Sequence, residues 1–237
     1  MNTVTVKRNN LLHLWHGFRD FLPIGLIVFS YAIVFGALAM KSGLTIPEAS
    51  LMSLTVFAGA SQFLALPMIQ NGASVWTLTS MALMVNMRHL LYGLNIGKKY
   101  SGASPLKLLG LSFGIVDETY AFNTIGPGRK ITSIPYFMGT ALCGYVVWNT
   151  GTVLGAMAGR WTSILKAEGL DFAMLAVFIS MIGSSIGDRR DWSILVCSGL
   201  AALAISRFAG GYWHLFVVGL AIPLAFAVLT KEGKNAA

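Results

Sequence analysis

The chain has 237 residues, of which 55% are hydrophobic and only 11% are charged, and its mean hydropathy is +0.69. Soluble proteins carry about 25% charged residues, so this composition indicates a membrane protein and excludes an ordinary soluble domain. The formal net charge of +8 does not require a nucleic-acid partner. Lys and Arg in the short loops of a membrane protein give the same total, and no basic patch is interleaved with aromatic residues.

Apolar runs bounded by charged residues, Gly or Pro are candidate membrane spans. They cover residues 21–40, 49–69, 73–94, 105–125, 134–158, 172–186, 193–205 and 212–229. A helix needs about 20 residues to cross a bilayer, and the sixth and seventh runs are shorter, so we expect seven or eight crossings. The predicted fold is an all-α, polytopic membrane bundle of about seven to eight helices. It has a cytoplasmic segment at 1–20, a transmembrane domain at 21–230 and a tail at 231–237.

The positions of Lys and Arg bear on the orientation, because positive loops favour the cytoplasmic side. A cytoplasmic N-terminus followed by simple alternation would leave Lys98, Lys99 and Lys107 outside the cell. This conflict predicts that one segment between residues 49 and 125 does not cross the membrane fully.

The second run is interrupted by Gly59-Ala60-Ser61-Gln62, which are small or polar residues. Unwound backbone at membrane depth offers free N–H and C=O groups, and the N-terminus of a half-helix favours an anion. These four residues are therefore candidates for binding a small ligand such as an amino acid. The alternative is a kinked helix in which Gln62 bonds to a neighbouring helix.

Polar residues occupy both faces of the third run. Asn86 and His89 share one face, and Arg88, Tyr92 and Asn95 share the opposite one. Arg88 is either a residue that extends to the membrane surface or the partner of a buried carboxylate. We assign Asn86 and Arg88 as candidate ligand-binding residues. His89 is a candidate proton carrier, because imidazole titrates near neutral pH.

Asp117 and Glu118 lie just past the centre of the fourth run. An ionisable residue at that depth costs about 2.5–3.5 kcal/mol on the insertion scale, so such residues usually serve a function. A carboxyl group that takes up and releases a proton is what proton-coupled transport requires, and we assign both residues to proton coupling. The alternative is a re-entrant or interfacial segment in which the two acids are simply solvated.

Gly151, Gly155 and Gly159 share one face of the fifth run, which predicts close helix packing, either within the chain or with another chain. Small polar breaks at Gly59-Ala60-Ser61 and Gly183-Ser184-Ser185 follow comparable helices in the two halves. Such matching breaks are typical of transporters built from inverted repeats, although chance also explains them.

Two further patterns favour neither an enzyme nor a metal site. Gly110-Leu111-Ser112-Phe113-Gly114 matches the G-x-S-x-G motif, but a nucleophile elbow needs a strand and a sheet, and none is predicted. Cys143 and Cys197 lie in apolar runs without metal-ligand spacing. We therefore expect no enzymatic activity and no cofactor or metal.

The chain resembles the AzlC family, the large subunits of bacterial branched-chain amino acid exporters. The resemblance is carried by residues 17–19, Pro23, the F-A-G-A-S-Q-F stretch at 57–63, N-M-R-H-L at 86–90 and Asp117-Glu118. It covers most of the chain and is densest from about residue 16 to 160.

This resemblance implies a multi-pass protein of the bacterial inner membrane that works with a small four-helix subunit of the AzlD type. It further implies proton-driven export of valine, leucine, isoleucine or methionine. A structural membrane subunit without transport activity and an uncoupled channel for small amphiphilic solutes are the alternatives. The sequence leaves the exact substrate, the direction of transport and the oligomeric state open.

Overall fold

The computed structural model describes residues 2–100, 102–131, 133–161 and 189–208, together with single positions at 176, 179, 183, 186 and 218. Within these residues the secondary structure is helical and contains no strand, which confirms the all-α class. The expected spans at 172–186 and 212–229 lie largely outside the described residues. The same holds for the tail and for most of the second half of the suggested repeat.

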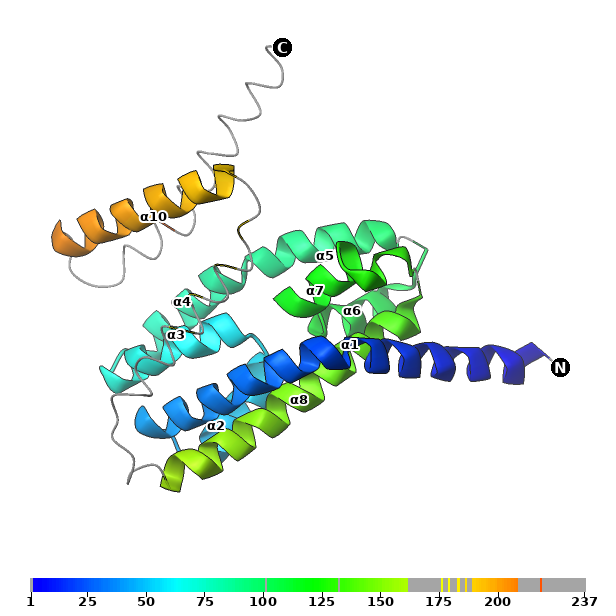
Figure 1. The fold of residues 1–237 in the computed structure, drawn as a ribbon, viewed down its shortest axis with the longest axis horizontal. Helices are drawn as coiled ribbons and strands as arrows, with labels where there is room; N and C mark the ends of the chain where they lie inside the picture. The colour runs from blue at the N-terminus through cyan, green and yellow to red at the C-terminus, as the bar shows by residue number, and fades with distance from the viewer. Residues whose placement is uncertain are drawn as a thin grey trace, which may run out of the picture.

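Two long helices, α1 (Asn2–Lys41) and α8 (Ile134–Trp161), lie side by side and run parallel (Figure 1). Gly151, Gly155 and Gly159 bring their backbones together, since a Cβ at any of them would lie less than 3.0 Å from an atom of α1. Small residues allow this close approach between membrane helices. The glycine face of α8 is therefore covered by α1 of the same chain.

Helix α1 extends further toward the N-terminus than the sequence predicts. It begins at Asn2 and continues through Pro23, so residue 20 is no helix boundary. The stretch Asn10–Lys41 is long and apolar enough to cross a membrane. The cytoplasmic location of residues 1–20 stays a prediction.

The second apolar run forms a helical hairpin of α2 (Ile46–Val56) and α3 (Gly59–Gln70), not a single span. Its turn is at Phe57, whose φ of 44° places it in the left-handed region. The fold-back brings Gln62 to within hydrogen-bonding distance of Ser53, at 3.1 Å. In a continuous helix these residues would be about 13 Å apart, because the rise is about 1.5 Å per residue.

The third apolar run forms α4 (Val75–Asn86) and α5 (Arg88–Lys99), which extend along the bundle in one direction (Figure 1). The residue between them, Met87, keeps right-handed helical angles (φ −53°, ψ −31°). Its N–H donates to the carbonyl of Met84, one residue closer than in an α-helix. The two helices therefore meet at a tightened turn, without a reversal of the chain.

The carboxylate segment also folds back, as α6 (Pro105–Phe113) and α7 (Asp117–Thr124), followed by a short 3-10 turn at Pro127–Lys130. The end of α6 reaches the middle of α8, where Phe113 contacts Tyr145. Farther along α7, Asn123 bonds to Thr140, which lies nearer the start of α8. Asp117 and Glu118 thus lie at the start of a half-helix, and the prediction that they sit inside one continuous span is wrong.

The two hairpins approach each other from opposite ends of the bundle. Their turns meet where Phe57 stacks on Phe113, with ring centroids 5.9 Å apart. Only the α4–α5 segment then connects the two ends between α1 and α8, which explains why those helices are parallel. The expectation of a single incomplete crossing between residues 49 and 125 is wrong, because two segments fold back.

Simple alternation of the predicted spans placed the lysines near residue 99 on the side opposite the N-terminus, against the positive-inside rule. The observed arrangement removes this conflict. The end of α5 lies at the same end of the bundle as the start of α8, since the Lys99 Nζ donates to the carbonyls of Asn123 (2.8 Å) and Arg129 (3.2 Å). The start of α1 lies there too (Figure 1). The parallel course of α1 and α8, which lead the two suggested repeats, is the relation of parallel repeats and does not support the expected inverted one.

The seventh apolar run lies within α10 (Arg189–Phe208), which is longer than the sequence predicts. Residues Asp191–Phe208 are enough to span a membrane by length and composition. The prediction that this run is too short to cross a membrane is therefore wrong.

Candidate functional site

A small cavity lies between the turns of the two hairpins and the middle of α1 and α8. Its volume, measured as the space open to the centre of a water molecule, is about 30 Å³. One water needs about 10–15 Å³ on this measure, so the cavity holds about two. Its lining combines aromatic rings with ionisable groups: Phe21, Val28, Tyr31, Phe57, Ala58, Gly59, Ala60, Phe63, His89, Val116, Asp117, Glu118, Gly144 and Trp148.

The start of α7 is fixed by a local hydrogen-bonded turn. The Thr119 hydroxyl accepts the N–H of Val116 (3.0 Å) and donates to the carbonyl of Gly114 (2.7 Å). Asp117 and Glu118 then occupy the first turn of the helix. Negative charge is favourable there because the helix dipole is positive at its N-terminus.

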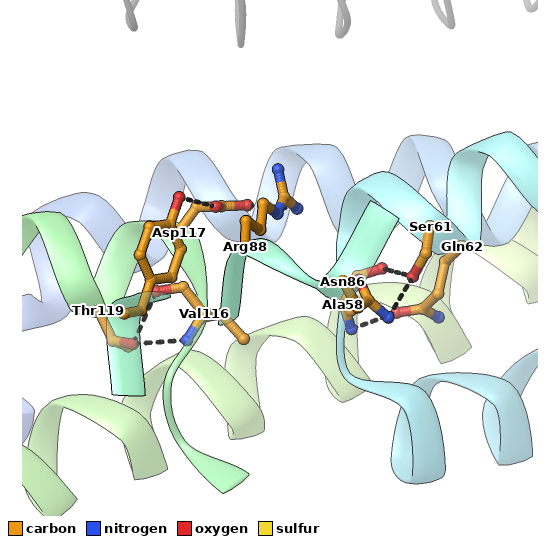
Figure 2. A network of polar contacts seen from close by, with 9 residues as sticks. Ala58, Ser61, Gln62, Asn86, Arg88, Val116, Asp117 and Thr119 are labelled. Carbon is orange, nitrogen blue, oxygen red and sulfur yellow. Dashed lines mark hydrogen bonds and ion pairs between the residues drawn. The ribbon is translucent and has the colours of Figure 1, made fainter. Parts of the chain in front are cut away.

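Asp117 is held by two groups from α5 (Figure 2). The Arg88 guanidinium lies 2.7 Å from its Oδ2. The Tyr92 hydroxyl donates to its Oδ1 at 2.9 Å. Both members of the ion pair are partly buried, with 30% and 28% of their side chains exposed. Arg88 is thus the partner of a carboxylate, one of the two alternatives given by the sequence.

The contacts of α5 with α7 continue beyond this pair. Tyr92 stacks on Tyr120 with ring centroids 4.1 Å apart, and Asn95 donates to the Tyr120 hydroxyl at 2.6 Å. Arg88, Tyr92 and Asn95 all contact α7, as their predicted common face requires. Tyr92 was not among the predicted site residues, although its spacing from Arg88 on the same face was a usable signal.

The start of α3 has no side-chain cap, so the first N–H groups of this half-helix have no capping partner at the cavity. Gly59 and Ala60 lie there, and the Trp148 ring packs against Gly59, where a Cβ would be 3.0 Å from it. Uncapped N–H groups and the helix dipole together favour an anion.

Gln62 ties the α2–α3 hairpin to α8 and is fully buried. Its Oε1 accepts the N–H of Ala58 (3.2 Å) and the indole N–H of Trp148 (3.1 Å). Its Nε2 donates to Ser53, whose hydroxyl bonds to Thr152 at 2.8 Å. The ring of bonds is completed because the Thr152 hydroxyl donates to the Trp148 carbonyl.

The structure separates the predicted site residues into two groups. Gly59, Ala60, His89, Asp117 and Glu118 line the cavity. The others, Ser61, Gln62, Asn86 and Arg88, lie behind its wall, where Asn86 donates to Ser61 at 3.2 Å (Figure 2). Their expected contact with a ligand stays a prediction.

The aromatic part of the cavity was not predicted from the sequence. Phe21 and Tyr31 come from α1 and Trp148 from α8, far from the polar motifs along the chain. No local pattern distinguishes them from ordinary core residues. The position of the break was also misjudged: Phe57 and Ala58 are unwound, whereas Gly59 to Gln62 form the first turn of α3.

The G-x-S-x-G match is not a nucleophile elbow. It lies on α6 and its end, with Ser112 donating to the carbonyl of Leu109 at 2.7 Å. A nucleophile elbow requires a strand before the turn. This segment therefore provides no support for a hydrolase.

The fold and the site together define a helical membrane protein with an internal polar site between two opposed half-helices. Residues 23–162 match the AzlC protein family, and the chain belongs to that family. It is 28% identical to the "Branched-chain amino acid transport protein AzlC" of Bacillus subtilis (strain 168), over 98% of this chain and 93% of the relative.

Two other relatives show similar levels of identity. The "Inner membrane protein YgaZ" of Escherichia coli (strain K12) is 29% identical over 78% of this chain and 77% of its own length. An "Uncharacterized membrane protein" of Archaeoglobus fulgidus is 31% identical over 85% of this chain and 89% of its own length. No solved structure matches the chain.

Proposed function

We propose that this protein is a secondary transporter of the bacterial inner membrane that exports valine, leucine, isoleucine and methionine in exchange for protons. The observation that carries the proposal is the cavity in which an uncapped half-helix N-terminus faces two carboxylates. The family membership and the name of the Bacillus subtilis relative support the amino acid class.

The two sides of the cavity suit the two charges of an amino acid. The free N–H groups at the start of α3 attract the substrate carboxylate. The side formed by Asp117 and Glu118 attracts the ammonium group, and the rings of Tyr31 and Trp148 can add cation–π attraction. Broken helices that bind the ends of a zwitterion near the midplane are a recurrent design in secondary transporters.

Asp117 and Glu118 have different surroundings and therefore different proposed roles. Asp117 is paired with Arg88 and bonded to Tyr92, so its charge is balanced in the resting state. Glu118 lines the same cavity and makes no ion pair with any other residue in the described part of the chain. We assign proton uptake and release to Glu118, with His89 beside it in the cavity. We assign recognition of the substrate ammonium group to Asp117, whose charge Arg88 balances from behind the cavity wall.

The small size of the cavity indicates that the transporter is in a closed state. Space for about two waters cannot admit an amino acid, so substrate entry requires the hairpin turns to separate. Movement of one packed unit against another around a fixed site is how alternating access operates. We propose that the small AzlD-type subunit binds outside the α1–α8 contact, since the glycine face of α8 is already covered.

Counterflow in proteoliposomes tests the function. Labelled leucine, valine and methionine are followed with an imposed pH gradient, with and without the co-expressed small subunit. Glu118→Gln and Asp117→Asn are compared with the control Glu48→Gln, an exposed carboxylate at the start of α2. We expect gradient-driven leucine transport that Glu118→Gln uncouples and Glu48→Gln leaves intact. If Glu118→Gln keeps its dependence on the gradient, the proton-coupling role is wrong. Transport of none of these amino acids would refute the substrate class.

A further inference from the structure

A second hollow shares part of its lining with the first. It is an apolar groove of about 170 Å³ between α6 and α8, and it is open on its outer side, where Phe113, Met138 and Leu142 are exposed. Helix α6 contributes Gly110 and Phe113, and α8 contributes Met138, Ala141 and Leu142. Phe57 lines both hollows and is the one residue that they share.

The Phe57 ring is the side chain best placed to separate the two hollows. It stacks on Phe113 (5.9 Å between centroids) and meets Tyr145 edge-on (5.0 Å), and the residue is 5% exposed. Its backbone adopts φ 44°, which is unfavourable for a residue with a bulky side chain. Strained residues of this kind concentrate at sites that move during function. The turn of the α2–α3 hairpin is therefore the part of the wall best suited to move.

From this geometry we infer that the groove is the pocket for the aliphatic side chain of the substrate, opened to the central cavity when Phe57 rotates away. The inference rests on the proposed function and specifies how that site selects its substrate. The central cavity supplies charged and polar groups but too little space, whereas the groove supplies apolar surface and space without charge. An amino acid with a branched side chain needs both, one on each side of Cα.

The one polar side-chain group in the lining of the groove, the Tyr145 hydroxyl, does not prevent the groove from holding an aliphatic side chain. The Tyr145 hydroxyl donates to the carbonyl of Leu54 at 3.0 Å, so its donor is already satisfied. The remaining lining consists of apolar side chains and glycine. Burying a branched aliphatic group there is favourable in proportion to its apolar area, and a smaller substrate gains less.

A substitution at Gly110 tests this inference. Gly110 lines the groove, and a Cβ at this position would meet no atom within 4 Å. Gly110→Leu therefore adds a large side chain at the edge of the groove without a clash at Cβ. Gly97→Leu on α5 is the matched control, since Gly97 is also open and lines neither hollow. The ratio of leucine to alanine transport is measured in proteoliposomes for the full chain and both variants.

We expect the leucine-to-alanine ratio to fall about tenfold or more in Gly110→Leu and to stay unchanged in Gly97→Leu, since a misfit of one or two carbon groups has this order of effect. If wild-type protein transports leucine but Gly110→Leu keeps the wild-type ratio, or loses both substrates equally, the groove is not the side-chain pocket and the proposed function stands. If wild-type protein transports no amino acid, the proposed function itself fails. Should Gly110→Leu not fold, Gly110→Ala must shift the ratio in the same direction by less, and an unchanged ratio refutes the inference.

Discussion

The Arg88 guanidinium lies 2.7 Å from the Oδ2 of Asp117, and each residue is the first of its helix, α5 and α7 respectively. Negative charge is favourable at the N-terminus of α7, where Asp117 lies. The ion pair balances the charge of Arg88 and joins the crossing segment α4–α5 to the hairpin of α6 and α7.

This pair predicts a measurable coupling. Arg88→Gln and Asp117→Asn should each destabilise the protein, because each leaves a partly buried charge without its partner. The double variant should be more stable than the sum of the two losses predicts, by about 0.5–3 kcal/mol, the range for residues in direct contact. Thermal unfolding in detergent measures all four proteins. Additive losses would show that the pair contributes nothing to stability.

Substitution of Tyr92 is expected to affect transport without affecting folding. Tyr92→Phe removes the hydroxyl that donates to Asp117 and keeps the ring stacked on Tyr120. We expect a several-fold weaker apparent affinity for substrate and a shifted pH profile of transport, with unfolding nearly unchanged. Tyr120→Phe is the control, since its hydroxyl bonds to Asn95 and not to a carboxylate. Equal effects of both variants would assign Tyr92 a purely structural role.

Substitution of Gln62 is expected to cause a large loss of stability. Gln62→Met removes the bonds to Ala58, Trp148 and Ser53, and a buried group without its partner costs about 1–3 kcal/mol. We expect a destabilisation of several kcal/mol by thermal unfolding, together with altered Trp148 fluorescence. Gln70→Met on the exposed end of α3 should have little effect. A stable Gln62→Met variant would contradict the proposed structural role.

The α1–α8 contact predicts that Gly155 tolerates no side chain. A Cβ there would overlap the backbone of Ile33, which cannot move aside without separating the two helices. Gly155→Val should prevent folding or lower the free energy of unfolding by more than about 3 kcal/mol, beyond the usual range for point variants. Gly199→Val on α10, where a Cβ meets nothing within 4 Å, is the matched control.

Glu48 predicts a pH-dependent contribution to stability. Hydrogen bonds from the Thr45 side chain and backbone hold the pKa of the Glu48 carboxyl below its ordinary value. Stability from the ionised form is therefore present above the unfolded pKa of about 4.3 and is lost as pH falls through the lower folded pKa. Wild type should exceed Glu48→Ala in stability at pH 6, and the difference should shrink by pH 3. A constant difference would indicate that the charge of Glu48 is irrelevant.

The polar residues that form the site could be found from the sequence, because an ionisable or small polar residue in an apolar run is conspicuous by its cost. Asp117, Glu118 and His89 were identified in this way and do line one cavity. The turn at Phe57 could not be located, since Phe is not a residue that usually adopts left-handed angles. The break was instead placed at the neighbouring glycine and serine.

Sequence alone determined the helical class, the apolar segments and the glycine face of α8, because composition and helical periodicity are local properties. Only the tertiary structure decided which segments cross the bundle and which fold back. A re-entrant hairpin and a membrane span bury similar apolar surface, so hydropathy cannot distinguish them. The long-range contacts do, by placing Gln62 against Ser53 and Phe57 against Phe113. Those contacts bring two half-helix N-termini, some 58 residues apart in the chain, to a single cavity.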